Sequence, residues 1–393
     1  MLPFHRKDDA MIERQLAPLF RKAALRYPSV TLFGPRQSGK TTLAKTCFPD
    51  YAYANLEHLA TRELAANDPD AFFRRFAPPV IVDEVQRVPS IVSQIQVMID
   101  ERRDEMGRFI LTGSHQTKLS KTVSQSLAGR TSILTLYPPS LAELGTEATR
   151  LATDELLLRG FMPDIHARSL EPVDWYRNYV LTYLERDVRQ MVHVKDLSLF
   201  ERFLVLLAGR VGQIVNASAL AGEIGVSSPT VSGWISILEA SFLIHRLQPW
   251  FTNRSKRMVK SPKLYFTEPG LAVHLLGIET ADQLLRDPLR GNLFENLVVA
   301  EALKQRANEG RAPNLWFLRT EDGFEIDLLR VSGRSLRPVE IKSAMTWHDS
   351  FAKNVRAFAR EEPGTDSPSV VYDGDDLDLS DGVSVRNFRT FHV

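Results

Sequence analysis

The chain has 393 residues, 44% hydrophobic and 25% charged, which is long enough for two or three globular domains. Its formal net charge of +1 excludes a uniformly basic nucleic-acid coat protein but leaves local basic patches open. Cys47 is the only cysteine, which excludes an intramolecular disulfide and a cysteine-based zinc site. The first residues lack the apolar segment of a signal peptide, and no apolar run is long enough to span a bilayer. We therefore expect a cytoplasmic protein without membrane contact.

The first predicted elements are a helix at residues 11–27 and a short apolar strand at 30–33. A phosphate-binding motif of the form G-x-x-x-x-G-K-T follows the strand, and a helix begins directly after it. The motif is meaningful only between a strand and a helix, which is where it lies. Its glycines let successive N–H groups point at phosphate oxygens, and the helix N-terminus adds partial positive charge. We predict a nucleotide-binding loop, rather than a simple glycine-rich turn, made of Gly34, Pro35, Arg36, Gln37, Ser38, Gly39, Lys40, Thr41 and Thr42.

ATP and Mg²⁺ are the expected ligands of this loop. Lys40 would reach the β- and γ-phosphates, and the Thr41 hydroxyl would ligate Mg²⁺. The apolar run 79–82 ends in Asp83 and Glu84, as a partner strand should. Asp83 would hold a Mg²⁺-bound water, and Glu84 would act as the general base for the attacking water. Two such acids can also mark a strand that enters a solvated turn, but the loop upstream favours the catalytic interpretation.

Between residues 51 and 136, short apolar strands alternate with helices (62–76, 91–105 and 119–128), which predicts a parallel sheet covered on both faces. Ser114, or Thr112, at the end of one strand could contact the γ-phosphate, although a Thr-Gly-Ser turn also forms for capping reasons alone. Arg130, before the strand at 132–136, could reach the nucleotide of a neighbouring subunit and stabilise transition-state charge. Equally, it could satisfy the carbonyls of its own helix.

Several motifs together resemble a widespread prokaryotic family of AAA-type ATPases. They are the loop at 34–42, Asp-Glu-Val-Gln at 83–86, Leu-Thr-Gly-Ser at 111–114, Leu-Ala-Gly-Arg at 127–130, Leu-Tyr-Pro at 136–138, Arg-Gly-Phe-Met-Pro at 159–163 and Tyr-Leu-Glu-Arg-Asp at 183–187. The resemblance implies an α/β P-loop ATPase domain, a helical lid that closes on it, a winged helix and a small restriction-endonuclease-like α/β domain. The expected boundaries are 1–145, 146–205, 206–285 and 286–393.

Residues 217–240 have the pattern of a helix-turn-helix, with Gly225 at the turn and Ser228 as the expected cap of the second helix. The runs 242–247 and 263–266 could pair as a wing. Between them lies a basic stretch that contains no acidic residue, which is typical of a DNA-backbone contact. A winged helix that packs within the chain or between subunits is the alternative. The predicted DNA contacts are Arg254, Lys256, Arg257 and Lys260.

The C-terminal region contains an amphipathic helix at 293–303 and predicted strands at 314–319, 323–329 and 336–343. Glu295, Asp327 and Glu340-Ile341-Lys342 resemble the acid, acid, Glu-x-Lys order of restriction-type nucleases. In such a site the carboxylates of Glu295, Asp327 and Glu340 would hold Mg²⁺, and Lys342 would orient water or stabilise charge. The alternative is a nuclease fold retained for binding DNA or a partner. Residues 373–381 are acidic and are expected to be solvated.

The sequence thus predicts a Mg²⁺-dependent ATPase whose nucleotide state moves a lid, a winged helix and a nuclease-like domain that act on DNA. A metal-dependent DNase gated by ATP is a second hypothesis. A third is an ATP-binding regulatory switch with negligible turnover. The position of Arg130 further suggests a homo-oligomer in which subunits share sites.

Overall fold

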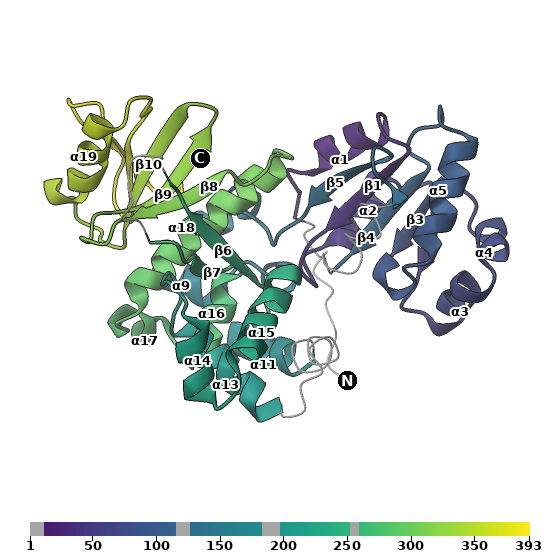
Figure 1. The fold of residues 1–393 in the computed structure, drawn as a ribbon, viewed down its shortest axis with the longest axis horizontal. Coiled ribbons are helices and arrows are strands. Elements are labelled where there is room, and N and C mark those ends of the chain that lie inside the picture. Colours follow the sequence, from purple (N-terminus) through teal and green to yellow (C-terminus); the bar gives the residue numbers. More distant parts are fainter. Residues whose placement is uncertain (1–11, 115–125, 183–196, 252–258) are drawn as a thin grey trace, which may run out of the picture.

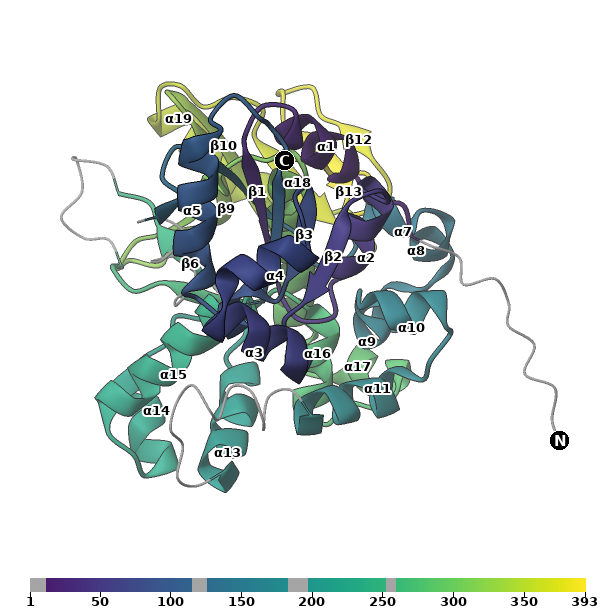
Figure 2. The ribbon, with the colours of Figure 1, turned by 90° about the vertical axis from the view of Figure 1, so that its right-hand side faces the viewer.

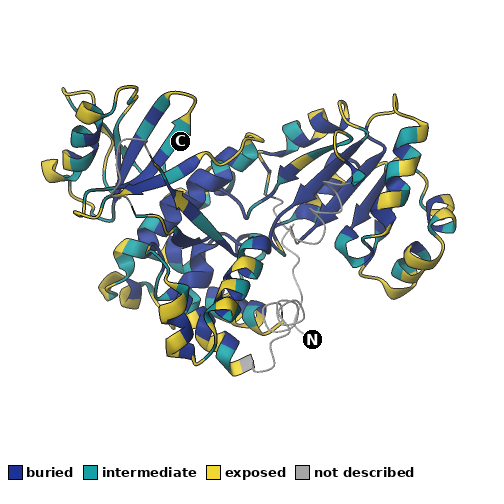
Figure 3. Ribbon diagram, in the orientation of Figure 1, coloured by how far each residue is buried: buried dark blue, intermediate teal, exposed yellow. Residues whose placement is uncertain are grey.

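Two β-sheets, with helices between and around them, form the described part of the chain (Figure 1). The computed structural model describes residues 12–114, 126–182, 197–251 and 259–393. Buried residues follow the strands of both sheets, whereas exposed residues lie mainly on the outer helices (Figure 3). Among the described residues, none of the helices combines the length and the apolar character that crossing a lipid bilayer requires.

The first sheet is fully parallel, with strand order β2-β3-β4-β1-β5. One hydrophobic cluster packs α1 and α2 against one face, and a second packs α3, α4 and α5 against the other. The predicted parallel sheet with two covered faces is therefore confirmed. The elements are α1 (Ala17–Ala24), β1 (Ser29–Phe33), α2 (Lys40–Cys47), β2 (Ala52–Asn55), α3 (Leu59–Asn67), α4 (Pro69–Arg75), β3 (Val80–Asp83), α5 (Ile91–Glu101), β4 (Phe109–Gly113) and β5 (Thr131–Thr135).

Two helices of this region differ from the prediction. Helix α1 covers only part of the helix expected at 11–27. The single helix expected at 62–76 is divided into α3 and α4. The division has a local cause, because Pro69 starts α4 and the Asp68 carboxylate accepts a hydrogen bond from the N–H of Ala71 at 2.8 Å. Most of the helix expected at 119–128 lies outside the described residues.

Helices fill the middle of the chain, and α13, α14 and α15 lie below the two sheets in both views (Figure 1, Figure 2). A buried carboxylate fixes part of this region: Glu268 Oε1 accepts hydrogen bonds from the N–H of Phe161 and the hydroxyl of Tyr176, both at 2.8 Å. The helices are α7 (Leu141–Leu144), α8 (Thr146–Arg150), α9 (Thr153–Arg159), α10 (Pro163–Ala167), α11 (Pro172–Tyr179), α13 (Leu197–Ala208), α14 (Ala217–Ile224), α15 (Ser228–Ala240), α16 (Pro269–Leu275) and α17 (Ala281–Arg286).

The predicted helix-turn-helix corresponds to α14 and α15. Gly225 ends α14 in a left-handed conformation with φ 84°. The cap of α15 is Ser227 and not Ser228, because the Ser227 hydroxyl accepts the N–H of Thr230 at 3.3 Å and Ser228 is already helical. Strands β6 (Ile244–Pro249) and β7 (Lys263–Phe266) pair in antiparallel register, as expected for the two runs.

The same hairpin belongs to the second sheet, which has eight strands in the order β12-β13-β11-β10-β9-β8-β6-β7. Strand β6 pairs in parallel with β8, with Gln248 opposite Trp316. One sheet therefore crosses the expected boundary at residue 285, and the domain limits remain predictions. The other elements are α18 (Arg290–Asn308), β8 (Leu315–Arg319), β9 (Glu325–Ser332), β10 (Ser335–Lys342), α19 (Lys353–Glu361), β11 (Ser369–Tyr372), β12 (Leu377–Asp378) and β13 (Ser384–Asn387).

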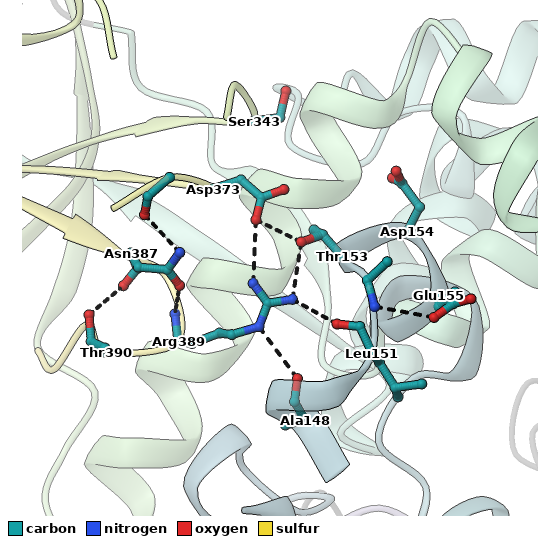
Figure 4. Close-up of polar contacts among 12 residues, drawn as sticks. Ala148, Leu151, Thr153, Asp154, Glu155, Ser343, Asp373, Asn387, Arg389 and Thr390 are labelled. Atoms are coloured by element: carbon teal, nitrogen blue, oxygen red, sulfur yellow. Dashed lines mark hydrogen bonds and ion pairs between the residues drawn. The ribbon is translucent and has the colours of Figure 1, made fainter. Parts of the chain in front are cut away.

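The C-terminal tail is attached to the start of α9 by buried charges (Figure 4). Asp373 accepts a hydrogen bond from Thr153 at 2.7 Å and lies 3.4 Å from Arg389. Arg389 also donates to the carbonyl of Leu151 at 3.0 Å. The expectation that residues 373–381 are all solvated is therefore wrong for Asp373, which is only 8% exposed because Thr153 and Arg389 satisfy its carboxylate.

Helix α18 also contacts the segment that follows β5. Two buried residues make the contact: Glu301 accepts the N–H of Leu141 at 3.0 Å, and Lys304 donates to the carbonyl of Pro139 at 3.0 Å. The Lys304 ammonium lies 3.9 Å from the Glu301 carboxylate and 3.5 Å from the centre of the Phe161 ring. One helix thus joins the second sheet to the chain that leaves the first sheet.

We expect Lys304→Met to destabilise the fold by about 3 kcal/mol, because Glu301 would lose its buried cation and the Pro139 carbonyl its donor. Urea unfolding of the full chain measures this change. Lys353→Met is the matched control, because Lys353 is exposed at the start of α19 and its loss should cost no more than about 0.5 kcal/mol. Equal stability of the two variants would contradict this account of the α18 contact.

Candidate functional site

The loop between β1 and α2 has a backbone that requires its glycines. A Cβ atom on Gly34 would lie 2.0 Å from the carbonyl oxygen of Leu136, so the loop and the segment after β5 are in direct contact. Gly39 precedes α2 in a left-handed conformation with φ 91°. The structure therefore gives the expected strand–loop–helix arrangement, with the N-terminus of α2 at the loop.

Lys40 is folded back over this loop. Its Nζ atom donates to the carbonyls of Pro35 at 2.7 Å and Gly34 at 3.1 Å, and the residue is 5% exposed. Burial lowers the pKa of Lys40 to about 8, while the carboxylates of Glu84 and Asp83 oppose that change. The ammonium is thus held by neutral carbonyl groups at the loop.

Asp83 is the centre of a group of hydroxyls. Thr41, in the first turn of α2, donates to both of its oxygens at 3.0 and 3.1 Å. Tyr53 of β2 donates at 2.7 Å, and Thr112 of β4 also donates to Asp83. Hydroxyl and carboxylate oxygens side by side are the ligands that Mg²⁺ prefers, so Thr41 and Asp83 fit the predicted ion. Tyr53 was not predicted from the sequence as part of the site.

Glu84 directly follows β3 and has a left-handed backbone with φ 58°, a conformation that is costly for a residue with a side chain. Its carboxylate accepts hydrogen bonds from Gln86 and, at 3.2 Å, from the Ser114 hydroxyl. Gln86 also donates to Ser114 at 3.0 Å. The end of β4 therefore fixes the carboxylate that the sequence predicts to be the general base. Gln86 is part of the Asp-Glu-Val-Gln motif, but its role was not predicted.

Arg14 connects the loop to the chain beyond β5. Its guanidinium donates to the carbonyl of Ser38 at 2.7 Å and that of Tyr137 at 2.6 Å, and it lies 3.2 Å from Glu143. Arg14 lies before the motif in sequence, and no local pattern marks it. Within the predicted loop, the Arg36 guanidinium also pairs with a neighbour, the Glu57 carboxylate, at 3.4 Å.

Arg130 lies at the end of the strands that is opposite to the phosphate loop. It precedes β5, whose first residue is aligned with Ser29 at the start of β1. A strand rises about 3.3 Å per residue, so the length of β1 separates Arg130 from the loop. Its guanidinium forms two 2.9 Å hydrogen bonds to the Asp100 carboxylate. Arg130 is thus not part of the site of its own chain, and a role at a neighbouring subunit stays a prediction.

A cavity of about 680 Å³ adjoins α2 on the side of Gly39. That volume is in the range of small-molecule sites. The cavity lies between residues 12–21, α2 and α10. No pattern in the sequence predicts it. The residues that line it include Ile12, Arg14, Gly39, Thr42, Pro163 and Arg168.

The nuclease-like residues do come together, but a further lysine lies among them. Asp327 accepts the N–H of Ile341 at 2.8 Å, and Lys342 lies 2.5 Å from Glu340. Lys263 of β7 lies 2.9 Å from Glu295 and 3.9 Å from Asp327. Burial, with Asp327 adding to it, raises the pKa of both Glu295 and Glu340 to about 7.

Within the described ranges, no group of three or more His, Cys, Asp or Glu residues is arranged to hold a metal ion. Because the Lys263 ammonium lies within 4 Å of both Glu295 and Asp327, the metal-binding role of Glu295, Asp327 and Glu340 stays a prediction. Of the predicted DNA contacts, Arg254, Lys256 and Arg257 lie outside the described residues, and Lys260 is exposed.

The comparisons with known proteins agree with this geometry. Residues 26–145 match the AAA domain family, and residues 150–282 and 290–391 match two domains of unknown function, DUF8612 and DUF4143. The fold and the loop thus define an AAA-type P-loop protein. Uncharacterised proteins of Mycobacterium bovis and Mycobacterium tuberculosis are each 32% identical to this chain over 355 residues, which is 88% of this chain and 77% of theirs. The chain belongs to the family of these proteins.

Among solved structures, the Walker-type ATPase PABY2304 of Pyrococcus abyssi is similar with a TM-score of 0.41 and 14% sequence identity. The match covers 70% of this chain and 98% of that one.

The affinity of the loop for ATP should fall as the pH rises through about 8, the pKa of Lys40 in the free protein. Phosphate binds the protonated ammonium, so above that pH binding must take up a proton, and affinity should decrease by up to about tenfold per pH unit. Calorimetric titration with a non-hydrolysable ATP analogue between pH 7 and 9.5 measures this. In Lys40→Arg the side chain stays charged over this pH range. The same pH dependence in that variant would contradict the assignment of the effect to Lys40.

Proposed function

We propose that this protein is a Mg²⁺-dependent ATPase and that Lys40, Thr41, Asp83 and Glu84 carry out its chemistry. One observation above all supports the proposal: the Thr41 hydroxyl and the Asp83 carboxylate meet at 3.0 Å beside a phosphate-type loop, and the Glu84 carboxylate is fixed next to them. Lys40 and Thr41 begin α2, whereas Asp83 ends β3 and Glu84 follows it, so the proposal is supported by two segments that are distant in sequence.

In this proposal the loop N–H groups and Lys40 bind the phosphates. Lys40 would exchange the carbonyls of Gly34 and Pro35 for phosphate oxygens, which bear more negative charge. Thr41 and Asp83 would hold Mg²⁺. When bound, this ion would neutralise negative charge on the phosphates. Glu84 would accept the proton of the attacking water, and Gln86 and Ser114 would keep its carboxylate in place.

The cavity beside α2 is the proposed site for the nucleoside. It adjoins Thr42, directly after the predicted Mg²⁺ ligand, and Pro163 and Arg168 line its other side. Residues of the expected helical lid would thus contact the same ligand as the phosphate loop. This supports a lid whose position depends on whether nucleotide is bound.

The contacts of Arg14 support a coupling between the site and the C-terminal region. Arg14 joins the carbonyls of Ser38 and Tyr137, and the segment after Tyr137 is held by Glu301 and Lys304 of α18. A change at the loop would therefore be transmitted to α18 through a short chain of buried polar contacts. This segment is the proposed connection between nucleotide state and the second sheet.

Lys40→Ala should abolish nucleotide binding, whereas Glu84→Gln should bind ATP and hydrolyse it about 100- to 10,000-fold more slowly, because only the general base is lost. Steady-state phosphate release and equilibrium binding of ATP separate the two effects. Glu63→Gln, an exposed acid on α3, is the control and should keep wild-type rates. Wild-type turnover in Glu84→Gln would exclude the proposed base. Negligible turnover in the wild type, together with tight binding, would favour the regulatory switch.

Duplex DNA is the proposed partner of the helix-turn-helix. The arrangement of α14 and α15 supports it, because α15 begins at a capped N-terminus and exposes the polar side chains of Ser232 and Ser236. The basic stretch between β6 and β7 follows the same unit in sequence. A homo-oligomer and a cytoplasmic location are further proposals that rest on the sequence.

Neutralising Arg254, Lys256 and Arg257 together should weaken binding to duplex DNA. It should also reduce the slope of log affinity against log salt by about three, because fewer counterions are released on binding when three cations are lost. Fluorescence anisotropy at several salt concentrations measures both. Neutralising the exposed Arg150, Arg286 and Lys353 is the control of equal charge change. An unchanged slope in the first variant would exclude this stretch as the DNA contact.

A further inference from the structure

The C-terminal acid cluster consists of Glu295, Glu325, Asp327 and Glu340. We propose that Lys263 is the built-in cation of this cluster, so that the cluster binds no divalent metal ion while Lys263 is in place. The consequence is that the C-terminal region does not cleave DNA by metal-ion chemistry. This inference does not depend on ATP hydrolysis at the loop.

Lys263 is placed at the centre of the cluster by short contacts. Its Nζ atom lies 2.5 Å from Glu325, 2.9 Å from Glu295 and 3.9 Å from Asp327, and the side chain is 3% exposed. An ammonium surrounded by carboxylates from β9 and α18 is thus a cation placed among the kind of oxygen ligands that divalent metal ions prefer. The chain itself therefore already supplies a cation to the cluster.

The backbone on both sides of Lys263 is fixed. Strand β7 pairs with β6, with Lys263 opposite Leu247, and Lys263 also forms a bridge to Ile214. The N–H of Leu264 donates to the carbonyl of Gln213 at 3.1 Å. Because a strand held at both edges cannot withdraw alone, Lys263 stays in the cluster as long as this part of the fold is intact.

The Glu295 carboxylate has a further donor. The hydroxyl of Tyr265, two residues after Lys263 and on the same face of β7, donates to Glu295 Oε1 at 2.5 Å. The oxygen that the predicted metal ion would use thus receives both an ammonium and a hydroxyl hydrogen.

Lys263 is additional to the lysine of the nuclease pattern. Lys342 has the Glu-x-Lys position and pairs with Glu340 at 2.5 Å on the other side of Asp327. The cluster is nevertheless within reach of solvent, because a cavity of about 660 Å³ is lined by Lys263, Glu295 and Asp327. An ion could therefore reach the carboxylates. The ammonium, and not a lack of access, excludes it.

Removing the ammonium should therefore create a cation site. Using the full chain without nucleotide and Mn²⁺ as the probe, we expect Lys263→Met to bind Mn²⁺ at least about tenfold more tightly than the wild type by electron paramagnetic resonance. Mn²⁺ should also raise the melting temperature of Lys263→Met more than that of the wild type, because only the variant gains a ligand in the acid cluster on folding. Both effects should disappear in Lys263→Met/Asp327→Asn.

Lys304→Met is the matched control, because it also removes a buried lysine but leaves a single carboxylate, Glu301, in contact. It should lose stability without rescue by Mn²⁺. Mn²⁺ bound to the wild type that is lost in Asp327→Asn, or supercoiled DNA cut by the wild type with Mg²⁺ and not by Asp327→Asn, would overturn the proposal. These wild-type measurements decide the question even where Lys263→Met does not fold. A Mn²⁺ signal lost only in Asp83→Asn belongs to the phosphate loop and leaves the proposal standing.

Discussion

The arrangement of this protein depends on one physical constraint, namely that a carboxylate removed from water must be given donors or a cation. The chain satisfies this constraint with groups that are distant in sequence. Asp83 receives hydroxyls from α2, β2 and β4, and Glu268 receives donors from the segment before α10 and from α11. Each buried acid thereby fixes several elements at once. The geometry of the phosphate loop site is a direct result, because Thr41 is held where Asp83 needs its hydroxyl.

Helix α18 shows how the same constraint connects the two sheets. One of its carboxylates, Glu295, lies in the C-terminal acid cluster, and another, Glu301, contacts the chain that leaves β5. The two residues are six positions apart on a rigid element, so their surroundings cannot move independently. A nucleotide-dependent displacement after β5 would reach the acid cluster through a single helix. The tail is attached to the helices in the middle of the chain in a similar way, since Asp373 and Arg389 contact the start of α9 and Leu151 just before it.

The parallel sheet, the loop and the Asp83-Glu84 pair could be predicted because short motifs and strand ends encode them locally. Tyr53 and Arg14 could not, since their contacts depend on the register of β2 and on the path of the chain before α1. The prediction that Asp373 is solvated is wrong for a related reason: an acidic run suggests exposure, whereas its partner Arg389 lies in the turn after β13. The sequence predicts Lys263 only as the first residue of a wing strand. Its place among the acids follows from the pairing of β6 with β8, which no local pattern specifies.

Two buried lysines of this chain illustrate how partner chemistry separates a site that can accept a ligand from one that is already filled. Lys40 is bonded to neutral carbonyls, and burial lowers its pKa to about 8, so an incoming phosphate offers it a better partner. Lys263 is bonded to carboxylates that raise its pKa, so it has no comparable gain from exchange. The same side chain is therefore poised for ligand binding at the loop and fixed as a structural cation in the acid cluster. This contrast explains why nucleotide chemistry is expected at the first sheet and not metal-ion chemistry at the second.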